Sequence, residues 1–185
     1  MKEYTREYPL FSLCGLNCGL CTHYQTQGKS KCPGCGGTDF HLRHPTCSVI
    51  TCNQKHDHVE YCFQCSLYPC ERYRSLDSGD TYISYRNVLR DMDLAKDNLE
   101  LYQSELNKKI EIAEFLIDNY NDGRRKSFYC KAVNLLQLTA LKDIVNEINE
   151  KLATQEILLD EKIELIAAIF EAQAKKENIE LKSQK

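Results

Sequence analysis

The cysteines constrain this sequence more strongly than any other feature. Ten of the eleven lie between Cys14 and Cys70, and the last is Cys130. This density is typical either of disulfide-stabilised secreted domains or of proteins that bind metal through thiolates. The first residues, MKEYTREYPLFSL, are charged and contain no apolar run, so we expect no signal peptide and a cytoplasmic location. Because clustered thiols in a reducing compartment more often bind metal, metal binding is favoured over disulfides.

The spacing of the cysteines is that of metal ligands. Three C-x2-C units occur, and each brings two sulfurs to one ion in a tight turn while backbone amides point at them. The middle unit, KCPGCGG, is typical of a zinc knuckle, because Pro33 fixes one turn dihedral and Gly34 and Gly36 tolerate positive φ. The candidate ligands are Cys14, Cys18, Cys21, Cys32, Cys35, Cys47, Cys52, Cys62, Cys65 and Cys70.

Histidines extend this ligand set. Ten cysteines are enough for two four-sulfur zinc sites, whereas three sites need two further ligands. All five histidines lie in the same segment, and the candidates among them are His23, His56 and His58. His23 follows Cys21 by two residues, and the other two precede Cys62. We therefore expect two or three zinc ions.

The grouping of the ligands is a separate prediction. The C-x2-C-x10-C-x2-C spacing predicts one zinc ribbon-like site made of Cys18, Cys21, Cys32 and Cys35. The second site takes Cys62 and Cys65 with two of Cys47, Cys52 and Cys70, which leaves Cys14 unplaced. An interleaved pairing stays open.

Other metal chemistry is less favoured. The C-x3-C-x2-C run from Cys14 to Cys21 resembles the cluster motif of radical-SAM enzymes, but no strands alternate with helices to build their barrel. An ordinary iron–sulfur cluster with a redox or sensing role stays as the alternative. A second alternative is a metal-dependent enzyme whose site lies between the cysteine-rich part and the helices. The excess of sulfur and the lack of a zinc-enzyme motif such as HExxH favour structural sites and a protein that is not an enzyme.

The chain divides into two regions of different composition. Residues 1–75 form a loop-rich head with too little Leu, Ile and Val to fold unaided, so a metal or a partner must stabilise it. Residues 76–185 carry apolar residues at helical spacing and should pack on the head. We therefore predict a mainly α protein with a small zinc-binding head and a tail of three to five helices.

The tail pattern predicts individual helices. Apolar residues at helical spacing run from Leu89 to Ile117 and predict a helix over residues 86–120. A break is possible at Asp97-Asn98, and Gly123 should end the helix as a left-handed cap. A second helix is expected over about 127–137. Thr139 should cap a helix over 140–153, and Asp160 one over 161–176. ENIELK, near the end, is expected to be a short strand or a frayed tail.

Charge argues against a nucleic-acid partner. The chain has a net charge of −3, and the head loses its slight positive excess once thiolates bind zinc. Tyr61, Phe63 and Tyr68 are interpreted as core residues rather than base-stacking platforms. No apolar run is long enough to span a membrane. We therefore expect a protein partner, which the sequence does not identify.

Two tail features have separate interpretations. Arg124, Arg125 and Lys126 precede a helix start near Ser127, and we interpret them as a solvated turn, with anion binding as the alternative. Cys130 lies far from the other cysteines in sequence and is interpreted as a buried helix residue, with a reactive thiol as the alternative.

The motifs CGLNCGLC, CPGC, CSVITC and EYCFQCSLYPCERY together resemble a prokaryotic family of cysteine-rich domains of unknown function, to which zinc binding is ascribed. The pattern of that family is roughly CGLxCxxC…CxGC…CxIxxC…CxxCxx[FY]PCE. The resemblance covers about residues 10–75 and includes all ten clustered cysteines. It implies zinc as the cofactor and implies no particular activity.

Overall fold

The computed structural model describes residues 3–44, 46–56, 58–74, 80–153 and 157–183. In these ranges the chain is helical and contains no named strand. The α-helices are α1 (Phe40–Arg43), α2 (Ser48–Asn53), α3 (Glu71–Arg74), α4 (Val88–Asp97), α5 (Leu99–Tyr120), α6 (Lys126–Leu135), α7 (Leu138–Ala153) and α8 (Leu159–Lys176). Three 3-10 turns lie in the head, at Cys18–Leu20 (η1), Gly28–Ser30 (η2) and Cys62–Gln64 (η3).

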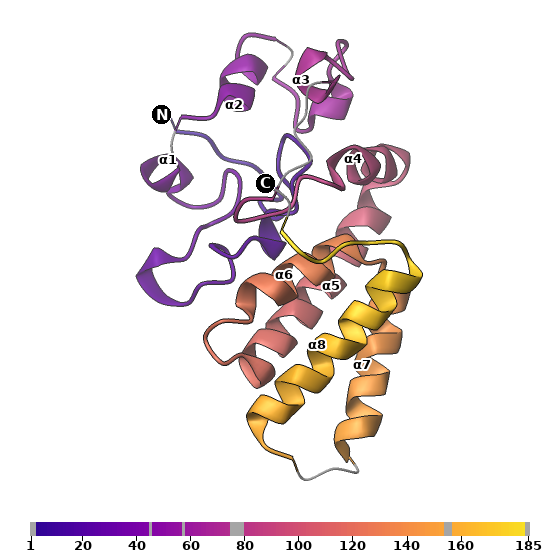
Figure 1. Cartoon of the computed structure of the whole chain (residues 1–185). Coiled ribbons are helices and arrows are strands. Elements are labelled where there is room, and N and C mark those ends of the chain that lie inside the picture. Colours follow the sequence, from indigo (N-terminus) through magenta and orange to yellow (C-terminus); the bar gives the residue numbers. More distant parts are fainter. Residues whose placement is uncertain (1–2, 45, 57, 75–79, 154–156, 184–185) are drawn as a thin grey trace.

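Figure 1 shows how these elements divide. The short helices α1, α2 and α3 and their loops form one end of the molecule, and the long helices α5 to α8 pack side by side at the other. The predicted class, a loop-rich head followed by a helical tail, is confirmed, and the tail holds five helices within its described residues. The expected boundary at residue 75 falls in 75–79, outside the described residues.

The predicted break in the long helical stripe is confirmed. Asn98 separates α4 from α5 with an extended backbone (φ −153°, ψ 94°). Its side-chain oxygen accepts a hydrogen bond from the backbone N–H of Leu101 at 3.0 Å, as an N-cap residue does. The apolar stripe faces the core as expected except at Leu89, which is 45% exposed. The break redirects the chain, so that α4 reaches the head while α5 joins the helical bundle.

Two predicted helix starts are wrong by one or two residues. Helix α5 ends at Tyr120, as predicted, and Gly123 adopts the predicted positive φ (86°), although it lies in the turn beyond the cap residue Asn121. Helix α7 already begins at Leu138, because burial of that side chain fixes the start more firmly than a Thr139 cap. Asp160 likewise lies inside α8.

The segment after α8 is neither a strand nor a frayed end. Asn178 adopts a left-handed backbone (φ 55°), and the N–H of Ile179 donates to the carbonyl of Ala174 at 2.8 Å, which closes the helix. The side chains of Ile179 and Leu181 then pack against the hydrophobic core. The backbone returns toward the head, where the Glu180 carbonyl accepts a hydrogen bond from Arg86 at 2.5 Å.

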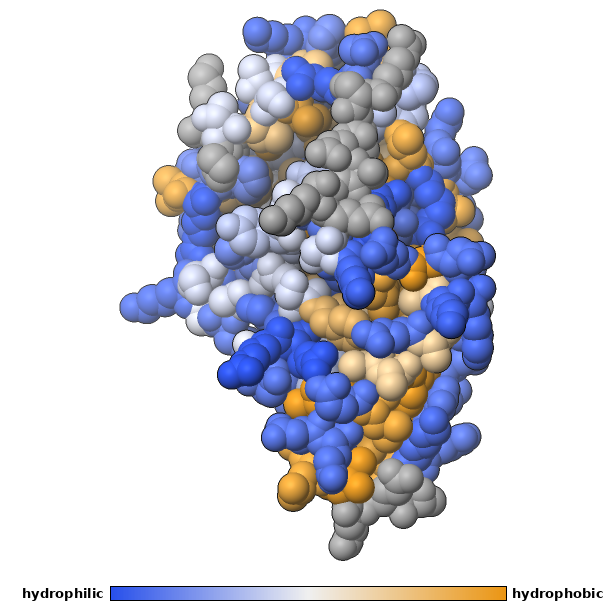
Figure 2. All heavy atoms as spheres, viewed as in Figure 1, coloured by the Kyte–Doolittle hydropathy of each residue, from blue (hydrophilic) through white to orange (hydrophobic). Residues whose placement is uncertain are grey.

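One hydrophobic core joins the head to the helices. Phe11, Leu20 and Tyr61 of the head are buried in the same cluster as residues of α4 to α8. Phe63 and Tyr68 pack at its edge, which agrees with their interpretation as core residues. A strip of hydrophobic side chains also lies on the surface of the helical half in Figure 2. In the described ranges, no helix combines the length and the apolar character that crossing a membrane requires.

Two glycines of the CGLNCGL motif permit this close packing. A Cβ atom at Gly15 would lie 2.5 Å from Cγ of Met92 in α4, and Gly15 also has positive φ (92°). A Cβ atom at Gly19 would lie 2.2 Å from Cδ1 of Ile110 in α5. Both distances are below any real carbon–carbon contact, so these positions need glycine for the cysteine loop to lie flat on the helices.

Candidate metal centre

Short turns hold the cysteine pairs. In η1 the N–H of Cys21 donates to the carbonyl of Cys18 at 3.1 Å, and in η3 the N–H of Cys65 donates to the carbonyl of Cys62 at 3.0 Å. The two C-x2-C units at the ends of the motif therefore share one backbone conformation. Each places two thiols on one side of a single turn.

The glycine-rich knuckle lies against the N-terminal segment. The N–H of Cys35 donates to the carbonyl of Pro9 at 2.9 Å, and the N–H of Arg6 donates to the carbonyl of Gly36 at 3.0 Å. Gly34 and Gly36 have φ of 82° and 77°, as predicted. Added Cβ atoms would lie 2.5 Å from the Pro9 oxygen and 2.7 Å from Arg6 Cγ, respectively. The approach of residues 6–9 thus depends on both glycines.

Leu13 connects the knuckle to the last cysteine cluster. Its carbonyl accepts a hydrogen bond from the N–H of Cys62 at 2.9 Å. The N–H of Leu13 is directed at the sulfur of Cys35. The N–H of Cys35, which donates to the carbonyl of Pro9, also lies beside the sulfur of Cys18. Backbone N–H groups directed at sulfur favour the thiolate form, which is the form that binds metal.

All eleven cysteines are free thiols. Around the knuckle, burial raises the pKa of Cys18 well above its usual value, and the neighbouring Cys35 and Cys14 raise it further. Burial likewise raises the pKa of Cys14 to about 12, with Cys35 and Cys47 among the groups that add to the shift. These four cysteines, Cys14, Cys18, Cys35 and Cys47, form what we call the knuckle group.

A second group of cysteines lies around η3. Burial raises the pKa of Cys62 to about 11, and the thiols that raise it further are Cys70, Cys65 and Cys52. We call Cys52, Cys62, Cys65 and Cys70 the terminal group. The hydroxyl of Tyr73 lies between the two groups, because it donates to the Cys14 carbonyl at 3.2 Å and to the Cys62 sulfur.

Cys21 and Cys32 form a separate pair. Burial raises the pKa of Cys21, whose sulfur accepts hydrogen bonds from the N–H groups of His23 and Tyr24, and Cys32 raises that pKa further. Cys62, Cys65, Cys52 and Cys70 are the thiols that one of the predicted second sites would use, and this grouping stays a prediction. Cys35, Cys14 and Cys21 all raise the pKa of Cys18, so Cys21 adjoins both the knuckle group and Cys32.

The candidate histidines lie at the surface. His23, His56 and His58 are all exposed. The ring of His23 lies 4.1 Å from that of Tyr82, and its carbonyl accepts the N–H of Cys32 at 3.0 Å. Within the described ranges, no three Cys, His, Asp or Glu side chains converge closely enough to hold a metal ion. The thiols are therefore close to one another in the head, but their sulfur atoms do not surround a common position.

Cys130 is not remote from the head in space. It is 2% exposed in α6, as its interpretation as a buried residue expects. Burial raises the pKa of its thiol to about 12, and Cys21 adds to the shift. Nearby, the Lys126 ammonium donates to the hydroxyl of Thr26 at 2.8 Å. Helix α6 therefore covers the Cys21 side of the head.

The turn before α6 satisfies its own amide groups. The side chain of Asp122 accepts the N–H of Arg124 at 2.8 Å and that of Arg125 at 3.1 Å. Arg125 is also paired with the carboxylate of Glu164. These contacts fit the interpretation of the three cations as an interhelix turn.

Arg6 is a buried cation that the sequence did not reveal. Its side chain is 1% exposed, and its Nη atoms donate to the carbonyls of Phe11 at 2.6 Å and Glu60 at 2.8 Å. Nη2 also lies 3.0 Å from Glu60 Oε1, and the guanidinium carbon lies 4.7 Å from the centre of the Tyr61 ring. The Nε atom is buried and has no hydrogen-bond partner among the described residues. The same guanidinium lowers the pKa of Cys35, opposing the effect of burial.

This donor set fits a thiolate-bound metal in its chemistry. The thiols are free, N–H groups are directed at the sulfurs of Cys18, Cys21 and Cys35, and a buried cation lies beside the last of these. Four thiolates around a divalent ion carry a net charge of about −2, which a buried guanidinium offsets. To bind one ion, the thiols would have to turn toward a shared point.

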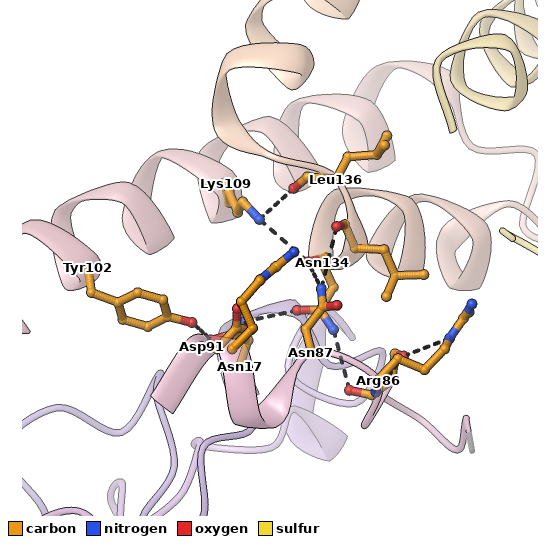
Figure 3. A network of polar contacts seen from close by, with 11 residues as sticks. Asn17, Arg86, Asn87, Asp91, Tyr102, Lys109, Asn134 and Leu136 are labelled. Atoms are coloured by element: carbon orange, nitrogen blue, oxygen red, sulfur yellow. Dashed lines mark hydrogen bonds and ion pairs between the residues drawn. The ribbon is translucent and has the colours of Figure 1, made fainter. Parts of the chain in front are cut away.

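A buried polar network fixes the cysteine loop on the helices (Figure 3). Asn17, which lies between Cys14 and Cys18, donates to Oδ2 of Asp91 and to Oδ1 of Asn134, both at 2.9 Å. Its own oxygen accepts the hydroxyl of Tyr102 at 2.8 Å. Asn17 therefore joins α4, α5 and α6 through one side chain.

Lys109 closes this network on the side of α5. Its ammonium donates to the carbonyl of Leu136, at the end of α6, at 2.6 Å. Burial lowers the pKa of Lys109 to about 8. Burial also raises the pKa of Asp91. A cavity of about 320 Å³ opens beside these groups, and the described residues that line it include no cysteine or histidine.

Comparison with known proteins agrees with the motif resemblance. A family model described as a protein of unknown function (DUF3795) matches residues 10–75. No curated protein and no solved structure matches the chain. The matched range contains all ten clustered cysteines and ends just after α3. Over residues 10–75 the chain is therefore similar to this family, whose function is unknown.

Proposed function

We propose that the head binds zinc through cysteine thiolates in closed, structural sites, and that the folded head acts as an interaction or regulatory module. The observation that carries the proposal is that all ten cysteines of residues 14–70 are free thiols, and that two of their C-x2-C pairs are each held by a single 3-10 turn. Clustered thiols without disulfides are typical of zinc proteins.

Two zinc ions account for eight of the ten cysteines in this proposal. The knuckle group supplies one site, and the terminal group supplies the other. Cys21 and Cys32 remain as a pair, and with His23 they would offer three ligands to a third ion. This grouping differs from the ribbon-like site that the spacing favours, because it exchanges Cys21 and Cys32 for Cys14 and Cys47.

The small size of the head core explains why a metal would be needed. Only Leu13, Cys35, Phe40 and Ile50 are buried in the core cluster that belongs to the head alone. Burial of four side chains, at roughly 1.5–3 kcal/mol each, stabilises by about 6–12 kcal/mol, which is small against the conformational entropy of ordering a head of this size. A structural zinc site contributes about 10–16 kcal/mol of apparent binding free energy, which becomes folding free energy.

The test is the metal content of protein purified without added metal and without oxygen. We expect two or three zinc ions per chain by elemental analysis and no visible absorbance. Iron together with inorganic sulfide would instead support the iron–sulfur alternative, and protein that stays metal-free after incubation with zinc would refute metal binding altogether.

Matched cysteine variants test the assignment of ligands. Cys35→Ser should lower the zinc content by one ion, because its thiol belongs to the knuckle group. Cys130→Ala is the control, since that thiol is buried in α6 outside both groups. Equal zinc contents for the two variants would contradict the grouping.

A further inference from the structure

We propose that the cavity beside Lys109 binds a small organic acid, with the carboxylate at Lys109 and an apolar body against the leucines of the cavity wall. The cavity has a volume of about 320 Å³ and lies where α4, α5 and the start of α7 meet. Among the described residues that line it are four charged side chains and three leucines. No cysteine takes part, so the proposal goes beyond the proposed metal binding and does not depend on it.

The first argument is an unused donor on a buried cation. Nζ of Lys109 donates to the carbonyl of Leu136 at 2.6 Å and to that of Asn134 at 3.4 Å (Figure 3). An ammonium has three N–H donors. In the described part of the chain, neither a third acceptor nor an ion pair engages this one. A carboxylate in the cavity would supply both the acceptor and the opposite charge.

The second argument is that the carboxylates of the cavity wall do not already neutralise this charge. Asp91 attracts the Lys109 ammonium, but both of its oxygens are engaged elsewhere. Oδ1 accepts from Nε and Nη2 of Arg90 at 3.2 and 3.0 Å, and Oδ2 accepts from Asn17 at 2.9 Å. Glu105 is exposed, so solvent screens its charge. The buried side of the cavity therefore carries a positive charge that an anion would balance.

The third argument is the apolar part of the wall. Leu94, Leu106 and Leu138 line the same cavity, and Leu94 is 48% exposed although it is apolar. Apolar side chains together with a few charged groups are typical of small-molecule sites, and this volume lies near the lower end of their range. A small carboxylate with a compact apolar body matches both halves of the wall.

The fourth argument is that the polar wall is fixed before any ligand enters. The hydroxyl of Tyr102 donates to Oδ1 of Asn17 at 2.8 Å, and the same asparagine donates to Asp91. Lys109 is held by carbonyls at the end of α6. Because these side chains are already ordered, ligand binding would cost little further conformational entropy.

The experiment is an NMR titration of the full chain with 3-phenylpropanoate, repeated with its neutral analogue 3-phenylpropanamide. The acid should bind with a dissociation constant on the order of 1 mM, as expected for a small unoptimised probe. The amide should bind at least about ten times more weakly, because a hydrogen bond between two charged groups is lost. Equal affinity for the acid and the amide would overturn the proposal.

The same titration locates the bound acid. Signals of Leu94, Leu138 and Thr139 should shift, since these residues line the cavity. Signals of Leu158, a 75% exposed leucine just before α8, should not shift. Shifts at Leu158 as large as those at the cavity would mean that the acid coats exposed apolar surface, and this outcome would also overturn the proposal.

Two variants change the charge of the cavity in opposite directions. Lys109→Met should weaken binding of the acid about 10–100-fold, since it removes the cationic donor. Lys108→Met is the matched control, because this neighbouring lysine is exposed and is not among the residues that line the cavity. Glu105→Gln removes an exposed carboxylate from the wall and should strengthen binding about 2–5-fold.

The variants also keep the proposal testable if one of them fails to fold. Lys109 holds the end of α6, so its replacement acts on stability as well as on charge. If Lys109→Met does not fold, Glu105→Gln decides alone, and unchanged or weaker binding overturns the proposal. Wild-type protein that shows no saturable binding of the acid overturns it directly. None of these outcomes bears on zinc binding, which the elemental analysis tests separately.

Discussion

Replacement of Asn17 by alanine is the most direct test of how the head is attached. Asn17 lies inside the cysteine motif, is 3% exposed, and makes three buried hydrogen bonds to three helices. The bond to the Asp91 carboxylate should contribute about 1.5–3 kcal/mol, and the two neutral bonds about 0.5–1.5 kcal/mol each. A water molecule can enter the space left by the side chain and replace part of this hydrogen bonding. We therefore expect the free energy of unfolding to fall by about 3–5 kcal/mol.

The assay is urea unfolding followed by circular dichroism, with and without zinc. Asn87→Ala is the control, because this half-buried residue belongs to the same network but donates only to the carbonyls of Asn134 and Leu135, at 3.0 and 3.4 Å. Its loss should cost about 1 kcal/mol. A double-mutant cycle between Asn17→Ala and Asp91→Asn should show a coupling of about 1–2 kcal/mol. If Asn17→Ala costs no more than Asn87→Ala, the network does not attach the head.

Three further predictions concern packing, pH and metal. Gly19→Ala should lower the free energy of unfolding by about 1–3 kcal/mol, because its Cβ would overlap Ile110. Ser104→Ala, at an exposed position of α5, is the control and should leave the thermal midpoint nearly unchanged; equal midpoints for the two variants would contradict this. The folded state depresses the pKa of Lys109 from 10.5 to about 8, so between these pH values the unfolded chain binds more protons and stability rises with pH. Lys109→Met should abolish that rise relative to wild type in urea titrations at pH 8 and 10, and a parallel pH dependence would refute the assignment. A strong chelator should make the trypsin sites at Lys29 and Lys31 cleavable before any site in α5, if metal stabilises the head; resistance equal to that of the zinc-loaded protein would count against it.

Sequence patterns predicted the helices well because helix existence depends on periodic apolar residues. The break at Asn98 was visible because an Asp-Asn pair interrupts that period and asparagine caps helices. Exact ends were harder to predict, because tertiary burial outweighed capping. Thr139 has the side chain of a cap, yet the burial of Leu138 starts α7 earlier.

The cysteine spacing predicts a class of metal ligand, but it does not predict which thiols are neighbours in space. Spacing reports which thiols share a turn, whereas grouping depends on how loops fold over one another. The hydrogen bond from Cys62 to Leu13 connects positions separated by most of the head, and no local pattern encodes it. The nearness of Cys130 to Cys21 depends in the same way on the packing of α6 against η1.

Arg6 shows a different limit of sequence reasoning. In the sequence it is one of several charged residues in MKEYTREYP, where a solvated position is the ordinary expectation. Its partners are the backbone carbonyls of Phe11 and Glu60. Every residue has a carbonyl, so the sequence does not indicate which ones will bind Arg6. Gly15 and Gly19, by contrast, could have been noticed, because glycines that flank a cysteine turn often mark a close approach by another element.

The shared core has a consequence for what counts as one unit of this protein. Sequence similarity marks out residues 10–75, but Phe11, Leu20, Tyr61 and Tyr73 of that range are buried against the helices that follow it. The segment cut at its sequence borders would expose this apolar face, and it would begin after Arg6, which braces the knuckle. The range that the family model matches is therefore shorter than the part of the chain that shares one hydrophobic core. In this chain, residues 10–75 therefore depend for their burial on the N-terminal segment and on the helices that follow them.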